Sequence, residues 1–220
     1  MKRRYIFLAA IVAIAVTSIF FLAAGVHAAT AGTTIPASNP FPWAWITTRA
    51  AGVTSYILLG LLSVTGMFLT TGILFRIMSP ATAWSLHRAI GSVLLFSVLL
   101  HVGALLFDTY IGLHLKDLLI PFISTYKPLY MGLGIIGFYL LLLVLATSLY
   151  TMTRHAKFWR FVHAFSFPMF ALIFLHSFFL GTDSKTWWMH SIYWGSAILV
   201  GLAVFYRLMW KYRSLDATAG

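Results

Sequence analysis

The chain has 220 residues, of which 61% are hydrophobic and only 9% are charged, and its formal net charge is +11. A soluble domain carries about 25% charged residues, so this composition excludes an ordinary water-exposed surface and predicts lipid as the main solvent. The sequence contains no cysteine, which excludes disulfides, cysteine-ligated zinc or iron–sulfur sites and a thioether-anchored haem. The positive charge lies between apolar runs, so we attribute it to membrane topology and not to a nucleic-acid partner.

Six apolar runs are long enough to cross a bilayer, because a transmembrane helix needs about 20 apolar residues. In chain order they are Tyr5–Ala24, Ser55–Ile77, Ala89–Phe107, Tyr130–Tyr150, Phe161–Leu180 and Ile192–Trp210. No stretch alternates with the period of two that a barrel strand requires. The sequence therefore predicts an all-α, six-helix transmembrane bundle and a multi-pass membrane protein.

The first run is open to two interpretations. Lys2-Arg3-Arg4, the apolar stretch and Val26-His27-Ala28 also resemble a cleavable signal peptide. The apolar part of a signal peptide usually has about 7–15 residues, and this stretch is longer, so we favour an uncleaved helix. Residues 1–29 are assigned to this first helix or signal peptide.

The distribution of lysine and arginine near the ends of the spans predicts the orientation. With the N-terminus inside, the outer side holds only Arg49, Lys116, Lys127 and Lys185. The inner side then holds Lys2, Arg3, Arg4, Arg76, Arg88, Arg154, Lys157, Arg160, Arg207, Lys211 and Arg213. We therefore expect both termini to be cytoplasmic and the protein to lie in the cell inner (plasma) membrane.

Four histidines lie inside predicted spans, where an ionisable side chain is a candidate for function. His87 and His101 are 14 residues apart on the third predicted helix, and His163 and His176 are 13 apart on the fifth. At about 1.5 Å per residue, each spacing separates two levels by about 20 Å. Both helices run outward, so His87 and His163 share the inner level and His101 and His176 the outer one. Two facing imidazoles can bind both axial positions of one haem iron, so the sequence predicts two b-type haems.

The 13-residue spacing leaves a mismatch in rotation. At about 100° per residue, 14 residues return to within about 40° of the starting face, whereas 13 miss it by about 140°. Pro168 lies between His163 and His176 and removes the hydrogen bond to the Ala164 carbonyl. We therefore expect a kink or a change of phase in the fifth helix.

Other residues near these levels fit a macrocycle. Arg88 at the inner level and Arg49 at the outer edge are candidate partners for haem propionates, although topology alone also explains Arg88. Several small residues also fit a macrocycle, but they let helices approach closely, so plain helix packing is an equal explanation for them. They are Gly91, Ser92, Gly103, Ala104, Gly132, Gly134 and Gly137.

The histidines also have interpretations without haem. They are alternatively polar core residues of a haem-free transporter or scaffold, hydrogen-bonded between helices along a polar path. Zinc and copper are disfavoured because they usually need three or four ligands at one level. The remaining histidines lie in loops or at span ends and are interpreted as interfacial side chains: His27, His114, His155 and His190.

The sequence around the four histidines resembles the ferric reductase-like transmembrane domain, which is shared with the membrane halves of NADPH oxidases and eukaryotic ferric reductases. The resemblance covers about residues 43 to 210, and we delimit a haem-binding domain at residues 43–212. It rests on Leu86-His87-Arg88-Ala89-Ile90-Gly91, Leu100-His101, Phe161-Val162-His163 and Leu175-His176. Similarity to bacterial stand-alone members rests on Thr48-Arg49-Ala50-Ala51-Gly52, Ser55-Tyr56, Tyr110-Ile111-Gly112 and Gly181-Thr182-Asp183-Ser184.

The resemblance implies an inner haem b on His87 and His163, an outer haem b on His101 and His176, and electron flow from the cytoplasmic to the outer face. NADPH oxidases carry a flavin and nicotinamide domain after the last helix, whereas this sequence stops at Gly220. We therefore expect a separate flavoprotein or a membrane quinol as donor, and ferric iron or a partner redox protein as the extracytoplasmic acceptor. No dinucleotide, P-loop, carboxylate-pair or nucleophile-elbow motif is present, which indicates an oxidoreductase component and not a self-contained enzyme.

The longest internal connection, Asp108–Pro128, is expected on the outer side. Its apolar stretch His114–Phe122 predicts a short helix on the outer surface, and the loop is a candidate docking site for the acceptor.

Two related families are alternatives. The membrane haem subunit of bacterial methionine-sulfoxide reductase systems tends to lack the first histidine of the third helix, and the presence of His87 argues against it. Respiratory cytochrome b also places paired histidines 14 residues apart. Its local motifs are less similar, and this sequence has no glutamate for its quinol-site motif.

Overall fold

The computed structural model describes residues 42–109 and 111–219, and side chains as far as residue 209. All regular structure in these ranges is helical, which confirms the all-α prediction for the described part of the chain. Five segments are long and apolar enough to cross a membrane: Trp43–Thr71, Pro80–Leu105, Pro128–Tyr150, Ala156–Leu180 and Trp187–Met209. The first predicted span, Tyr5–Ala24, lies outside the described residues.

Local signals set the helix boundaries. Helix α2 (Trp43–Thr71) ends at Gly72, whose φ of 74° is the left-handed conformation that glycine adopts without strain. The 3₁₀ turn η1 (Ile73–Arg76) follows. Helix α3 (Pro80–Leu105) begins with proline at its first position, and the Ser79 hydroxyl accepts a hydrogen bond from the Thr82 N–H at 3.2 Å.

The spans begin earlier than the apolar runs indicated. Helix α2 starts at Trp43 and not at Ser55, and it ends at Thr71 and not at Ile77. Helices α3 and α8 (Trp187–Ala219) start at Pro80 and Trp187, where Ala89 and Ile192 were predicted. One charged residue that was excluded from the runs is Arg49, and it lies within a helix because it forms an ion pair with Asp183.

The fifth predicted span consists of two helices. Helix α6 (Ala156–His163) ends at the histidine, and α7 (Ser166–Leu180) starts three residues later. Since Pro168 has no N–H, the Ala164 carbonyl accepts from the Phe167 N–H at 3.2 Å, and the Phe165 N–H donates to the Val162 carbonyl at 3.0 Å. These tight i→i+3 bonds interrupt the helix directly after His163, which confirms the expected change of phase.

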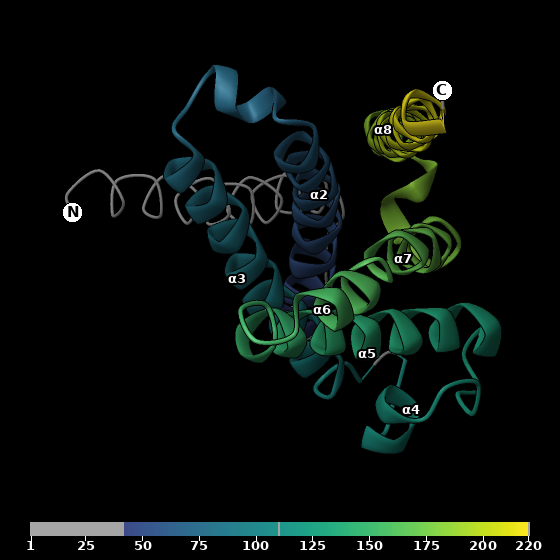
Figure 1. Cartoon of the computed structure of the whole chain (residues 1–220). Helices are drawn as coiled ribbons and strands as arrows, with labels where there is room; N and C mark the ends of the chain where they lie inside the picture. Colours follow the sequence, from purple (N-terminus) through teal and green to yellow (C-terminus); the bar gives the residue numbers. More distant parts are fainter. Residues whose placement is uncertain (1–41, 110, 220) are drawn as a thin grey trace.

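The helices pack mainly as two pairs. Helix α2 packs along α3, and α5 (Pro128–Tyr150) packs along α7. A central apolar cluster joins the pairs: Leu58, Leu59, Ile90, Leu94, Leu141, Met169, Phe170 and Val200. Figure 1 shows α8 at one edge of the molecule, with α2 between it and α3. Among the described residues, α3 and α7 have little direct packing, and a cavity lies between α2, α3, α5 and α7.

The connection between α3 and α5 folds against the flank of α5. The predicted short helix is present as α4 (Leu115–Leu119), and it lies on the side of α5 that faces away from α2 (Figure 1). Leu118 is buried, and the Tyr139 hydroxyl, from the middle of α5, donates to the Leu119 carbonyl. The exposed side chains of the connection are largely apolar: Leu106, Phe107, Leu115, Leu119, Ile120, Phe122 and Ile123. An exposed apolar surface of this kind marks a contact with lipid or with a partner protein, and its role as a docking site stays a prediction.

Candidate functional site

The four intramembrane histidines lie in two pairs. The ring centroids of His87 and His163 are 6.3 Å apart with an interplanar angle of 53°, and those of His101 and His176 are 6.5 Å apart with an angle of 89°. In each pair, one ring belongs to α3 and the other to the α6–α7 segment. All four side chains are half-buried. The structure therefore brings together the residues that the sequence placed at matched depths.

The spacing of each pair suits one metal between two imidazoles. A metal–imidazole bond is about 2 Å long, and the ring centroid lies about 1 Å beyond the nitrogen, so two trans imidazoles have centroids about 6 Å apart. Within the described residues, no group of three or more His, Asp or Glu side chains gathers at a possible metal position. Two histidines alone fit an ion that takes its other ligands from a macrocycle, as haem iron does.

The second pair, His101 and His176, is oriented by backbone carbonyls. His101 Nδ1 lies 2.8 Å from the Thr48 carbonyl oxygen, and His176 Nδ1 lies 2.9 Å from the Tyr130 carbonyl oxygen. A carbonyl can only accept, so each Nδ1 carries the proton and donates it. Nε2 of both rings is then a free lone pair, which is the form that binds a metal.

A glycine exposes each of these carbonyls. Gly52 and Gly134 follow Thr48 and Tyr130 by four residues, and in a helix the side chain at that position stands beside the carbonyl. A Cβ at Gly52 would lie 2.9 Å from His101 Nδ1, and a Cβ at Gly134 would overlap the ring of His176. Close approach of the imidazoles to the backbone therefore requires glycine at both positions.

His87 is oriented by a hydroxyl. Thr65 Oγ1 lies 3.3 Å from His87 Nδ1 and donates its one proton to the Leu61 carbonyl at 2.8 Å. With its proton directed at that carbonyl, the hydroxyl can accept a hydrogen bond from His87 Nδ1. Gly66 again lies against the ring, because its Cβ would be 3.1 Å from His87 Cε1.

His163 is oriented in the same way from α5. Ser148 Oγ lies 3.4 Å from His163 Nδ1, donates to the Val144 carbonyl at 2.7 Å and accepts from the Trp159 indole N–H at 3.1 Å. The Trp159 ring also packs on the imidazole, with centroids 5.1 Å apart. The Nδ1 contacts of all four histidines are thus compatible with one tautomer, in which Nε2 is available.

A partly open cavity lies at the His101–His176 pair, between α2, α3, α5 and α7, and its wall is mainly apolar. Gly52, Gly134 and Gly137 line it, so backbone forms part of the wall. Thr48 and Ser55 also line it, and their hydroxyl oxygens are buried without a hydrogen-bond partner. A flat apolar group with a few polar edges fits such a cavity, which is consistent with a macrocycle.

The predicted arginines differ in their surroundings. Arg49 lies at the cavity, where its guanidinium pairs with Asp183 at two points and stacks over Trp45 at 5.0 Å. Arg88 is exposed beside the first histidine pair. Arg207 of α8, which the sequence analysis counted only among the inner-side cations, lies close enough to His163 for an electrostatic interaction. Binding of a propionate by Arg49 or Arg88 remains a prediction.

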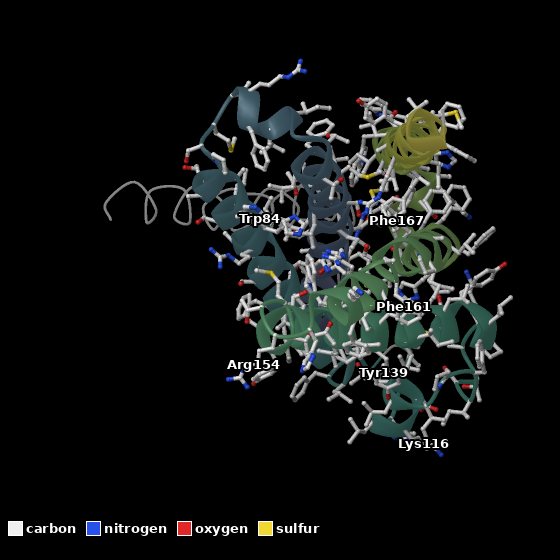
Figure 2. All side chains as sticks on the ribbon, viewed as in Figure 1. Trp84, Lys116, Tyr139, Arg154, Phe161 and Phe167 are labelled. Atoms are coloured by element: carbon white, nitrogen blue, oxygen red, sulfur yellow. The ribbon has the colours of Figure 1, made fainter. Side chains whose placement is uncertain are left out.

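The remaining predicted positions lie away from the pairs. The exposed histidines His114, His155 and His190 are at the starts of α4, α6 and α8, and His27 is outside the described residues. Among the small residues, Gly132 packs against Phe122, and Gly91 faces Leu62 and Leu145. Side chains reach outward at the molecular edge, as Figure 2 shows for Lys116 and Arg154.

The sequence analysis missed the partners of the histidines: Thr48, Thr65, Tyr130 and Ser148. A signal for them is present, because Gly52 and Gly66 on α2, and Gly134 and Ser148 on α5, are each 14 residues apart. This is the spacing of His87 and His101. A helix that supports two histidine levels repeats at the same interval as the helix that bears them.

Comparison with known proteins gives one match. Residues 51–175 match the model of the family described as ferric reductase like transmembrane component. Neither a curated protein nor a solved structure matches the chain.

Proposed function

The chain belongs to the ferric reductase-like transmembrane component family, and from this membership we propose that it is a two-haem cytochrome that carries electrons across the plasma membrane. His87 and His163 would hold one haem b, and His101 and His176 the other. When bound, each haem supplies a one-electron Fe(III)/Fe(II) couple at its level. The rest of the chain fixes the imidazoles, excludes water and separates the two levels.

The observation that carries this proposal is the equivalence of the two pairs. The ring centroids are 6.3 and 6.5 Å apart in the two pairs, and every Nδ1 has an oxygen as its partner. The Nε2 lone pair of each of the four inward-facing rings is then left to bind a metal. Histidines that only filled a polar core would be expected to hydrogen-bond to one another or across the helices with both nitrogens. The supporting helices supply oxygen partners to Nδ1 at every histidine, which favours ligation through Nε2.

The proposed direction is from the His87–His163 level to the His101–His176 level. Exposed cations lie near the first pair: Arg88, Arg154, Lys157 and Arg160. They agree with a cytoplasmic face and suit an acidic flavoprotein donor, with a membrane quinol as the alternative. The acceptor, ferric iron or a redox protein outside the cell, would approach the cavity at the second pair.

Haem content and a reduced-minus-oxidised spectrum of the purified full chain test the proposal. We expect two non-covalent haems per chain, both extractable by acidic acetone because no cysteine can anchor them. In inverted vesicles, a donor added outside should reduce an acceptor trapped inside. His101→Ala should stop that transfer while some haem reduction persists. A reproducible content of one or zero in haem-replete protein would refute the two-haem proposal, and zero would favour a haem-free transporter.

A further inference from the structure

We propose that Thr65 and Ser148 are positioning residues that set the tautomer and the basicity of the His87–His163 pair, and thereby give its haem a higher reduction potential than backbone-supported histidines would. The inference rests on the proposed binding of haem. It concerns a level at which side chains, and not the backbone, hold the ligands.

The two levels differ in the strength of their Nδ1 contacts. At the second pair the acceptors are carbonyls at 2.8 and 2.9 Å, whereas at the first pair they are hydroxyls at 3.3 and 3.4 Å from the ring nitrogens. N–H···O hydrogen bonds are commonly about 2.7–3.2 Å long, so the hydroxyl contacts are the weaker ones.

This difference has a predictable electronic consequence. A hydrogen bond that draws on the Nδ1 proton makes Nε2 more basic, and a more basic ligand favours Fe(III) over Fe(II). The strong carbonyl contacts therefore lower the potential at the His101–His176 level. The weaker hydroxyl contacts lower it less at the His87–His163 level. Second-shell hydrogen bonding is among the influences that set such potentials.

Both hydroxyls are held firmly enough to act in this way. Thr65 is anchored by its bond to the Leu61 carbonyl. Ser148 uses its full capacity of one donated and two accepted bonds, with Val144, Trp159 and His163. Neither side chain can turn away from its histidine without losing a bond to its own helix.

The test uses the full chain with both haems bound. Thr65→Val and Ser148→Ala should each raise the midpoint potential of one haem and leave the other unchanged, and Thr65→Ser should restore the wild-type value. If the tautomer is lost, one haem of the two should fall in affinity by about 10-fold or more, and this outcome also supports the proposal. Repeating the titration in a His176→Ala background identifies the affected haem.

Matched controls are Thr70→Val and Ser63→Ala, because these α2 hydroxyls bond only to carbonyls of their own helix, at Met67 and Leu59. The inference would be overturned if the midpoint potentials equalled those of the controls, or if both haems shifted equally. Two bound haems in the same protein would still support the proposed function. Wild-type protein without haem would instead refute the proposed function itself. Ser148→Ala keeps the inference testable if Thr65→Val fails to fold.

Discussion

Arg49 of α2 and Asp183 of the turn η2 (Thr182–Lys185) form a two-point ion pair between segments 134 residues apart in sequence. The Asp183 side chain is 3% exposed and that of Arg49 is 27% exposed. The pair ties the connection between α7 and α8 to the first part of α2. Because α2 carries the Thr48 carbonyl and α7 carries His176, the pair also holds together two walls of the cavity.

Removal of Arg49 should cost more stability than removal of Asp183. In Arg49→Gln the carboxylate stays buried without its partner, a situation that costs about 3–5 kcal/mol. In Asp183→Asn the remaining guanidinium has access to solvent, so a smaller loss is expected. Thermal unfolding in detergent measures both, and the double variant should lose less than the sum of the single changes. Equal and additive losses would contradict this account.

Alanine at the glycines should act on one histidine level at a time. Gly134→Ala and Gly52→Ala push His176 and His101 away from their carbonyls. Each variant should therefore weaken or abolish the binding of the haem at this pair. Gly66→Ala should affect the other haem, through His87. Gly103→Ala is the matched control, because a Cβ there meets no atom within 4 Å. Haem content and the optical spectrum are the measurements, and a haem loss in the control would show that the effect is not local.

Replacing single histidines should separate the two levels. His101→Ala or His176→Ala should remove one haem and leave the other largely intact, and His87→Ala or His163→Ala should do the converse. The exposed His114, His155 and His190 serve as controls, and each change to alanine should keep both haems. The ligand set is wrong if any of these three proves necessary for haem binding in spectra of the purified protein.

The connection between α3 and α5 should lie in lipid. Ile120 is 51% exposed among other apolar side chains, and burying such a surface in lipid is favourable. Since the native chain has no cysteine, Ile120→Cys can be labelled alone. In nanodiscs it should react slowly with a charged maleimide, whereas Arg154→Cys, at an exposed turn, should react fast. Similar rates would place the connection in water and favour it as a docking surface for the acceptor.

Much of the helical architecture follows from the sequence because lipid requires long apolar helices. The interruption of the fifth span was predictable from Pro168, since a missing N–H must be compensated in the adjacent turn. The start of α2 was not predictable from the apolar run, because Arg49 and Thr48 look like loop residues until their partners in other segments are known.

The proximity of the histidine pairs was also expected from matched depths on parallel helices. Their support was not, because a carbonyl is present at every residue and the sequence does not mark the two that are used. Thr65 and Ser148 are ordinary residues for a membrane helix, where a hydroxyl can bond to its own backbone. Only the three-dimensional placement of α2 against α3, and of α5 against α7, distinguishes them.

Support of a histidine by a backbone carbonyl and support by a side-chain hydroxyl differ in their sensitivity to mutation. Every amino acid has a carbonyl, so the side chains of Thr48 and Tyr130 can vary without loss of the contact, provided that Gly52 and Gly134 remain. At the other level, each exchange of Thr65 or Ser148 alters the contact directly. The hydrogen bonds at the His101–His176 level are therefore insensitive to substitution of the acceptor residues. Those at the His87–His163 level can be altered gradually by single substitutions.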